Sequence, residues 1–169
     1  MSLGPIKLGC FNNWFRSCNS LSAIITIIIA IILVNIGSSP FSSYLNRHFG
    51  EWMATPMQIV KAPGVIFKLV VVAPLIETLV AQGLPFWLAW RFRFLPKAAP
   101  ACIAISALIF GCSHYYSLGY MVQGTLVGFV FATAYWLRGA KQVAFLNILA
   151  SHLLYNVLLV LLSVAFART

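Results

Sequence analysis

The sequence predicts an all-α polytopic membrane protein, a bundle of about five transmembrane helices with a short interfacial amphipathic helix. Of its 169 residues, 62% are hydrophobic and only 8% are charged, and the mean hydropathy is +0.95. A soluble domain carries about a quarter of its residues as charged ones. The apolar residues are also gathered into runs of about 20, the length that spans a bilayer as a helix. Residues 1–169 are therefore expected to form a single membrane domain, because the chain is too short for two.

The first predicted span covers Ser20 to Gly37 and is dominated by isoleucine. Lys7 and Arg16 precede it, which gives the region a superficial likeness to a signal peptide. The apolar run is long for a signal peptide, however, and no clean cleavage site follows it, so we expect a retained first membrane helix. The stretch "GSSP" is expected to end this helix, with Ser39 as an N-cap and Pro40 as the first residue of the next helix.

Residues 41–56 are expected to lie in the headgroup plane as a short amphipathic helix. Asn46, Arg47 and Glu51 fall on the side away from the apolar residues, a pattern typical of interfacial helices. A loop packed on the bundle is the alternative. Residues 1–56 would then form an N-terminal part, and residues 63–166 the core. The apolar stripe consists of Phe41, Tyr44, Leu45, Phe49, Trp52 and Met53.

Four further spans are predicted, and basic turns separate some of them. The second span runs from Pro63 to Trp90, with kinks expected at Pro74 and Pro85. If these prolines divide it into two helices, the bundle has six spans. The turn "RFRFLPK" follows the second span, and "RGAK" precedes the last one. The remaining spans are expected over residues 98–116, 118–137 and 143–166.

The distribution of Lys and Arg predicts an N-terminus in the cytoplasm, because cytoplasmic loops carry the excess of basic residues. Five spans would leave seven basic residues on the cytoplasmic side and four on or near the other side. The protein is therefore expected to be multi-pass, in the cytoplasmic membrane if its source is prokaryotic. The seven are Lys7, Arg16, Arg91, Arg93, Lys97, Arg138 and Lys141, and the four are Arg47, Lys61, Lys68 and Arg168.

Charge and cysteine content exclude two other classes of protein. The net charge is +9, but no Lys or Arg cluster forms a patch that would bind nucleic acid. The four cysteines show no CxxC pair and no zinc-ligand spacing. In the fourth span Gly124, Gly128 and Ala132 recur every four residues, which predicts close packing against another helix.

Four polar residues lie in or near spans, where hydrocarbon penalises them: Glu77, His114, His152 and Asn156. An ionisable group near the centre of a membrane helix costs about 2.5–3.5 kcal/mol on insertion scales, so such residues usually face the interior of the bundle. His152 and Asn156 are four residues apart and share a helical face, as do Phe110 and His114. Three helices thus each present a polar face, and we expect these faces to meet.

Together these side chains could hydrolyse an amide bond. A carboxylate is a suitable general base for water, and an imidazole can orient that water. A second imidazole and an amide can hold a developing oxyanion. Each residue also has a structural explanation, namely a histidine bonded to a carbonyl group or an asparagine linking two helices. Glu77 is too far from Lys68, nine residues away, to pair with it directly within one helix.

The same residues give the chain a resemblance to the CAAX protease and bacteriocin-processing (Abi) family of glutamate-type intramembrane proteases. The family pattern is E-E-x-x-x-R, then F-x-x-x-H, then H-x-x-x-N or H-x-x-x-D. Here the corresponding segments are "ETLVAQ" from Glu77, "FGCSH" ending at His114, and "HLLYN" from His152 to Asn156. The resemblance covers roughly residues 70–160.

The resemblance implies a role for each matching residue. Glu77 would activate water with help from His114, His152 and Asn156 would form the oxyanion hole, and Phe110 would line the pocket. No metal or other cofactor would be required, and a peptide or lipidated protein would be the substrate. A peptide or protein substrate and membrane lipid are thus the expected partners.

Two positions depart from the family pattern, since Thr78 stands in place of the second glutamate and Gln82 in place of the arginine. Positions four residues apart can pair across one helical turn. We therefore expect a neutral hydroxyl–amide pair between Thr78 and Gln82 where the family has two charges, both within the substrate pocket. Losing only one charge would leave its partner buried and unpaired.

Two other functions are compatible with the sequence. The chain could be a catalytically inactive binding or accessory subunit of a membrane complex, with a membrane protein as its partner. Alternatively, Glu77 and the two histidines could form a proton or metal path, although the other spans offer no second ionisable station for a relay.

Overall fold

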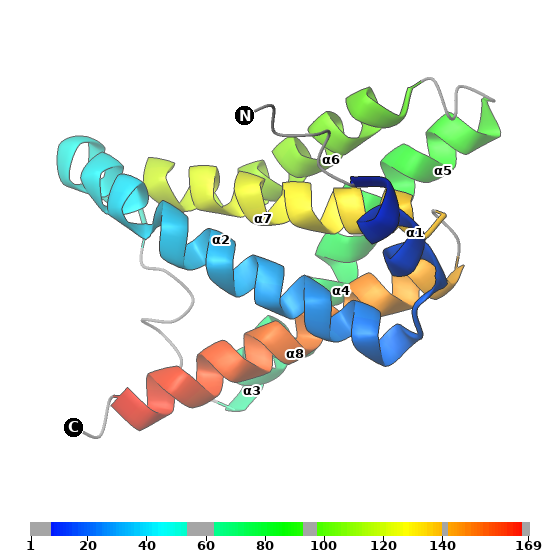
Figure 1. Ribbon diagram of the computed structural model, residues 1–169. Coiled ribbons are helices and arrows are strands. Elements are labelled where there is room, and N and C mark those ends of the chain that lie inside the picture. Colours follow the sequence, from blue (N-terminus) through cyan, green and yellow to red (C-terminus); the bar gives the residue numbers. More distant parts are fainter. Residues whose placement is uncertain (1–7, 54–62, 93–97, 140–141, 167–169) are drawn as a thin grey trace, which may run out of the picture.

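The computed structural model describes residues 8–53, 63–92, 98–139 and 142–166, and these residues form an all-α polytopic membrane protein (Figure 1). Within them, four helices are long and apolar enough to cross a membrane: Ser20–Phe49, Gly64–Arg91, Leu118–Leu137 and Gln142–Ala165. The helix of the third predicted span, α6 (Ala99–Ser113), is apolar but only 15 residues long. The other helices of these spans are α2 (Ser20–Phe49), α7 (Leu118–Leu137) and α8 (Gln142–Phe166).

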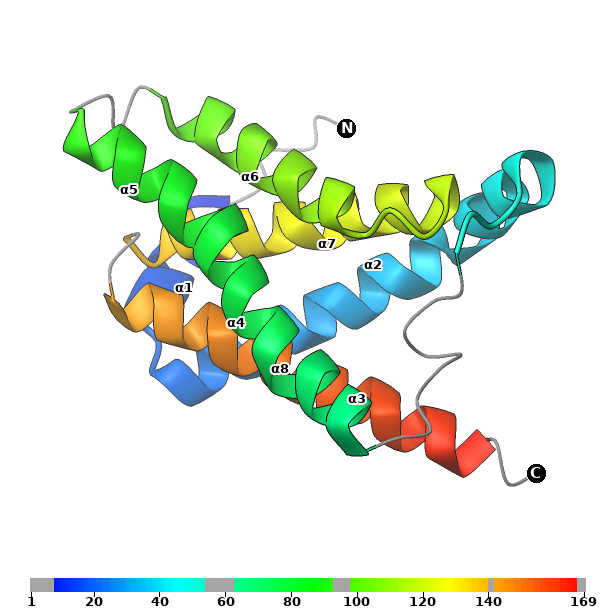
Figure 2. The ribbon, with the colours of Figure 1, turned by 180° about the vertical axis from the view of Figure 1, so that it is seen from behind.

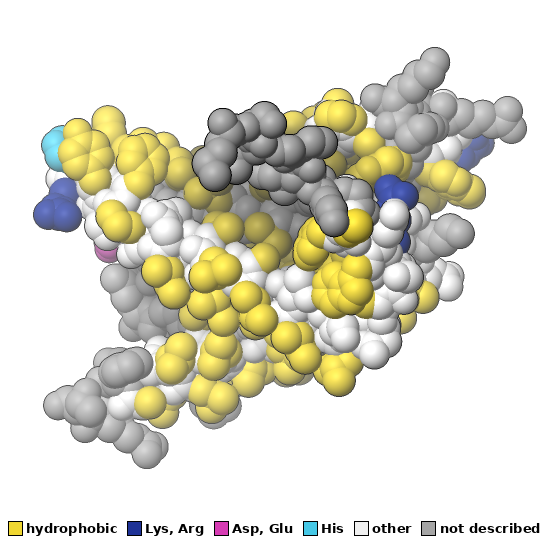
Figure 3. All heavy atoms as spheres, viewed as in Figure 1, with side chains coloured by type: hydrophobic (Ala, Val, Ile, Leu, Met, Phe, Trp, Pro, Cys, Tyr) yellow, Lys and Arg dark blue, Asp and Glu magenta, His cyan; other side chains and the backbone are white. Residues whose placement is uncertain are grey.

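The surface has the polarity that a membrane requires. Many large apolar side chains are exposed, including Leu21, Leu33 and Ile36 of α2, each more than 60% exposed. On the face drawn in Figure 3, apolar atoms spread across the middle, and the charged side chains lie at the left and right ends. Apolar side chains in contact with lipid carry no solvation cost, so this arrangement is stable only in a bilayer.

The expected end of the first span at "GSSP" is wrong, because α2 continues through Pro40 to Phe49 without a break. Ser39 is therefore not an N-cap. The predicted interfacial helix is instead the last part of α2 as far as Phe49, and residues 54–56 lie outside the described part. The N-cap of α2 is Asn19, whose side chain accepts a hydrogen bond from the backbone N–H of Ser22 at 2.8 Å.

Tertiary packing explains why α2 continues. Ser38 and Ser42 are both buried, whereas Phe41 is 54% exposed. The face of α2 that carries these small polar residues therefore packs against the bundle, and Phe41 points away from it. The side chain of Asn46 accepts a hydrogen bond from the backbone N–H of Gly119, at the start of α7. In hydrocarbon a helix must also satisfy its backbone groups internally, which favours continuing over a break at one proline.

The second predicted span is one long helix, so the alternative of two helices is wrong (Figure 2). It has two π-helical turns, in which each N–H donates to the carbonyl five residues earlier: Ala73 to Lys68, and Leu84 to Leu79. π-Helical turns of this kind often occur at functional sites. The consecutive parts are α3 (Pro63–Phe67), η2 (Lys68–Val72), α4 (Ala73–Glu77), η3 (Thr78–Gly83) and α5 (Leu84–Arg91).

A side chain of another helix binds the long helix one turn before Pro85. Proline has no backbone N–H, and in the π-helical register set by the bond from Leu84 to Leu79 the donor that it lacks would have served the carbonyl of Val80. The neighbouring carbonyl, of Ala81, has a donor from outside the helix. The hydroxyl of Ser106, on α6, donates to this carbonyl. Ala81 and Ser106 are both buried, so water does not compete for the carbonyl. The side chain of α6 therefore fixes the position of the long helix.

The glycine stripe of the fourth span packs against α6, as its spacing predicts. A Cβ added at Gly128 would lie 2.7 Å from the Cβ of Phe110, and one at Gly124 would lie 3.1 Å from the Cγ of His114. The partner helix is thus in the same chain. The predicted third span extends too far, since α6 ends at Ser113 and a turn precedes the N-cap of α7, Ser117.

Arg138 connects the start of the chain to the end of α7. Its guanidinium donates to the backbone carbonyls of Phe15 at 3.0 Å and Cys18 at 2.7 Å, which lie at the end of α1 (Leu8–Ser17) and just beyond it. The side-chain amide of Asn147, on α8, is oriented so that its oxygen and its nitrogen both form hydrogen bonds. The oxygen accepts from Arg138, and the nitrogen donates to the hydroxyl of Ser20. Arg138 and Asn147 together therefore join α1, α2, α7 and α8.

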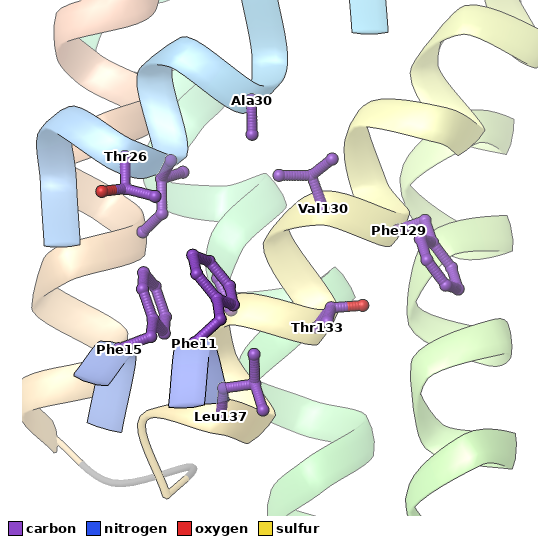
Figure 4. Close-up of a pocket in the computed structure, with 10 residues that line it drawn as sticks. Phe11, Phe15, Thr26, Ala30, Phe129, Val130, Thr133 and Leu137 are labelled. Carbon is purple, nitrogen blue, oxygen red and sulfur yellow. The ribbon is translucent and has the colours of Figure 1, made fainter. Parts of the chain in front are cut away.

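Two apolar pockets lie away from the predicted site. The first, of about 200 Å³, lies between α1, α2 and α7, where Phe11 and Phe15 of α1 approach Val130 (Figure 4). The second, of about 1320 Å³, lies between the η3–α5 segment and the facing ends of α7 and α8, and includes Trp87 and Trp136. None of the predicted site residues lines either pocket.

Candidate active site

Glu77 and His152 meet between the second and last spans. Glu77 is the last residue of α4, and its Oε2 lies 3.5 Å from Nε2 of His152 on α8. The carboxylate side chain is 22% exposed, whereas the imidazole is 4% exposed. Glu77 can thus be reached from outside the protein core, while His152 is held inside it. The acid and one imidazole converge, as the polar faces predict.

The His114 imidazole lies at the end of α6 and not against the acid. Its Nδ1 is 2.8 Å from the carbonyl oxygen of Phe110 and 3.0 Å from the hydroxyl of Ser113. A carbonyl oxygen only accepts, so Nδ1 carries the proton and Nε2 of the neutral ring is an acceptor. Among the described residues, the only histidine ring nitrogen within 4.0 Å of the Glu77 carboxylate is Nε2 of His152.

Phe110 packs against both histidines. Its ring centroid lies 4.7 Å from that of His114 and 5.4 Å from that of His152. Phe131 of α7 lies 5.0 Å from the His152 ring and 5.5 Å from the Phe110 ring. The two phenylalanines are buried, so they form a rigid apolar wall that positions the imidazoles of α6 and α8 relative to each other.

Asn156 has a structural partner. Its side-chain amide donates to the backbone carbonyl of Leu69 at 2.9 Å. In the π-helical register set by the bond from Ala73 to Lys68, the next donor to Leu69 would be Pro74, which has no N–H. The asparagine supplies that missing donor. Its amide nitrogen carries two hydrogens, so a second donor hydrogen remains.

The expected hydroxyl–amide pair between Thr78 and Gln82 is not formed. The Thr78 hydroxyl lies 3.3 Å from Nδ1 of His152. Gln82 is fully buried, and neither its amide oxygen nor its amide nitrogen has a hydrogen-bond partner in the described structure. The prediction was wrong because it considered only neighbours within one helix, whereas the short hydroxyl reaches an imidazole on another.

Sequence reasoning missed two aromatic residues at the site, Phe131 and Tyr120. The Tyr120 ring lies 5.3 Å from the His114 ring. Both residues could have been found, because Tyr120 lies one turn before Gly124, and Phe131 three residues after Gly128, on the face already predicted to pack closely. Ser106 gave no such signal, since its role depends on the carbonyl of Ala81 in another helix.

The fold and this site define a polytopic membrane protein with a buried acid–imidazole pair. A family model described as Type II CAAX prenyl endopeptidase Rce1-like matches residues 59–158. This match covers more than half of the chain and all seven predicted site residues, and the chain belongs to this family of membrane proteases. No curated protein and no solved structure is significantly similar to it. Within the described part of the chain, no three His, Cys, Asp or Glu side chains are grouped so that they could hold a metal ion.

Proposed function

We propose that the protein is an intramembrane endopeptidase that hydrolyses a peptide bond with water activated by Glu77. The observation that carries this proposal is the approach of Glu77 and His152, with 3.5 Å between Oε2 and Nε2 at a partly accessible carboxylate. Membership in a family of CAAX prenyl endopeptidases supports a substrate with a C-terminal CAAX box whose cysteine is prenylated.

In the proposed reaction, the carboxylate of Glu77 takes a proton from water, and the hydroxide attacks the carbonyl carbon of the peptide bond. The Nε2 acceptor of His114 orients the same water. The tetrahedral intermediate then collapses as the C–N bond breaks, and Glu77 returns its proton to the leaving amine. No step is assigned to a metal or cofactor.

His152 and Asn156 would stabilise the oxyanion of that intermediate. His152 directs Nε2 toward the site, and Asn156 retains one amide hydrogen beyond its bond to Leu69. Removing one oxyanion donor from a protease lowers kcat by about 10²–10³-fold. Asn156 in this proposal has both roles, since one hydrogen holds η2 and the other is free to bind the substrate.

The test uses purified protein in lipid vesicles and a fluorogenic peptide that ends in a CAAX box with a prenylated cysteine. Glu77→Gln should abolish cleavage, and Glu51→Gln is the matched control because Glu51 is the only other acid and is exposed. Cleavage by the Glu77→Gln protein at the unaltered rate would refute the proposal. The same peptide without the prenyl group tests the substrate class.

A non-catalytic accessory function is the second candidate. The bond from Asn156 to Leu69 favours it, since this polar group of the motif already has a structural partner. If the protein has this accessory function, the Glu77→Gln variant would still support the cellular process that depends on the protein. It would also copurify with a membrane-protein partner in fixed stoichiometry. Loss of the process with assembly intact would exclude it.

We also propose that the N-terminus lies in the cytoplasm. Arg16, Arg91 and Arg138 then share the cytoplasmic side, and Arg93, Lys97 and Lys141 would join them from outside the described residues. At about 1.5 Å per residue, α6 is about 22 Å long and ends inside a hydrocarbon core of about 30 Å. His114 at that end would lie where water can enter from the opposite side. Labelling of single cysteines at either terminus tests this orientation.

A further inference from the structure

The residue that follows Glu77 has a contact of its own with the predicted machinery. Thr78 begins η3, and its side chain is fully buried. Its hydroxyl lies 3.3 Å from Nδ1 of His152. Threonine is also one of the two departures from the family pattern, so this contact is a property of the present chain.

The other nitrogen of the same imidazole faces the acid, with Nε2 of His152 3.5 Å from Oε2 of Glu77. An ionised carboxylate only accepts hydrogen bonds, so the facing nitrogen must carry a proton to interact with it. A neutral imidazole has one proton, which leaves Nδ1 as an acceptor. The Thr78 hydroxyl is then the donor, since a hydroxyl can donate to a bare ring nitrogen.

We propose that Thr78 is a positioning residue that holds His152 in its Nε2-protonated tautomer and fixes the orientation of the ring. The hydroxyl donates to Nδ1, and the Nε2–H group points at the place where Glu77 and the substrate meet. This inference rests on the proposed function for its kinetic consequence, but the tautomer itself is a property of the protein without substrate.

No other described polar group is bonded to Nδ1 of His152. The ring is enclosed by Phe110 and Phe131, whose centroids lie 5.4 and 5.0 Å from its own and which offer no hydrogen-bond donor. The side chain of Gln82, one turn from Thr78, makes no hydrogen bond with any residue that the structure describes. The tautomer is therefore set by two atoms, the hydroxyl on one side of the ring and the carboxylate on the other.

His114 is held in the opposite tautomer by the same logic. The carbonyl oxygen of Phe110 accepts from its Nδ1, which leaves Nε2 bare. One imidazole of the site is thus preset as an acceptor and the other as a donor. Hydrolysis needs both, because water loses a proton and the oxyanion receives a hydrogen bond. A carboxylate at position 78 would instead accept from Nδ1 and favour the other tautomer of His152.

The first test is ¹⁵N NMR of the histidine rings in micelles, without substrate. The chain has only three histidines, so single His→Gln variants assign every signal. We expect His152 to be protonated at Nε2 and His114 at Nδ1. His48, whose Nδ1 lies 2.9 Å from the carbonyl oxygen of Tyr44, is an internal reference expected to be protonated at Nδ1. Protonation of His152 at Nδ1, or at both nitrogens, would overturn the proposal.

Thr78→Val, which has nearly the same shape but no hydroxyl, should move the Nδ1 resonance of His152 toward that of a nitrogen without a hydrogen bond. The signals of His48 and His114 should stay in place, and Thr78→Ser should restore the wild-type spectrum. An unchanged His152 spectrum in the valine variant would contradict the assignment. If the valine variant does not fold, Thr78→Ala provides the same comparison with the serine variant.

The kinetic test separates positioning from a structural role. We expect Thr78→Val to lower kcat by about 10–100-fold with little change in KM, because a shift of about 1 Å in a functional group can cost about 100-fold in rate. Thr78→Ser should return kcat to near the wild-type value. Equal losses in both variants would show that the hydroxyl is not the cause. If Glu77→Gln leaves cleavage unaltered, the proposed function fails, while the NMR result still decides the role of Thr78.

Discussion

Ser106→Ala should destabilise the protein because it removes a hydrogen bond between two membrane helices at a buried carbonyl. The Ser106 hydroxyl donates to the carbonyl of Ala81. Leaving a buried acceptor unsatisfied costs about 1–3 kcal/mol. Hydrogen bonds between membrane helices contribute about 0.6 kcal/mol on average and about 1.7 at most. The expected loss in the free energy of unfolding is therefore about 1–2 kcal/mol.

Ser151→Ala is the matched control, because Ser151 is equally buried but donates to the carbonyl of Asn147 in its own helix. That carbonyl keeps its backbone donor, so the control should change stability little.

The assay is unfolding in mixed micelles by titration with dodecyl sulfate, followed by the fluorescence of the five tryptophans. Equal stability of the Ser106→Ala and Ser151→Ala proteins would refute the reasoning.

Four other substitutions have defined outcomes. Gly128→Ala brings a Cβ to 2.7 Å from its neighbour and should cost about 1–3 kcal/mol in the same titration, whereas Gly37→Ala, with nothing within 4 Å, should gain up to about 1 kcal/mol. Phe110→Leu should lower kcat by about 10-fold or more, because both imidazoles lose their common wall; an unchanged kcat would show that the wall does not matter. Arg138→Lys loses the fork that joins α1 to α7, so limited proteolysis should cut the α1 region faster than in the wild type.

Hydropathy identified the membrane helices because the bilayer imposes one strong rule on each segment, namely a long apolar run. The helix ends were less predictable, as α2 shows. The stretch around Pro40 has the local chemistry of a helix start, yet Asn19 is the cap and the helix continues to Phe49. The packing of Ser38 and Ser42 into the bundle decides where the helix ends. That packing depends on helices far away in the sequence, so the local sequence around Pro40 does not reveal it.

At the candidate site, the approach of two residues was predictable from the sequence, and the other contacts were less so. Glu77 and His152 converge as expected, because a buried charged group needs a polar partner from another helix. The partner of Thr78 was assigned wrongly, since an i, i+4 rule sees only the same helix. The bond of Asn156 could have been inferred from Pro74, whose missing N–H leaves a carbonyl to be satisfied, but the identity of that carbonyl depends on a π-helical register.

Two hydrogen bonds from other helices explain how the fold sets the depth of Glu77. The carbonyl of Leu69, eight residues before the acid, is bonded by Asn156 of α8, and the carbonyl of Ala81, four residues after it, is bonded by Ser106 of α6. A helix fixed at two points on either side of Glu77 can neither slide nor rotate without losing a hydrogen bond in an environment that offers no replacement. The acid therefore stays opposite His152.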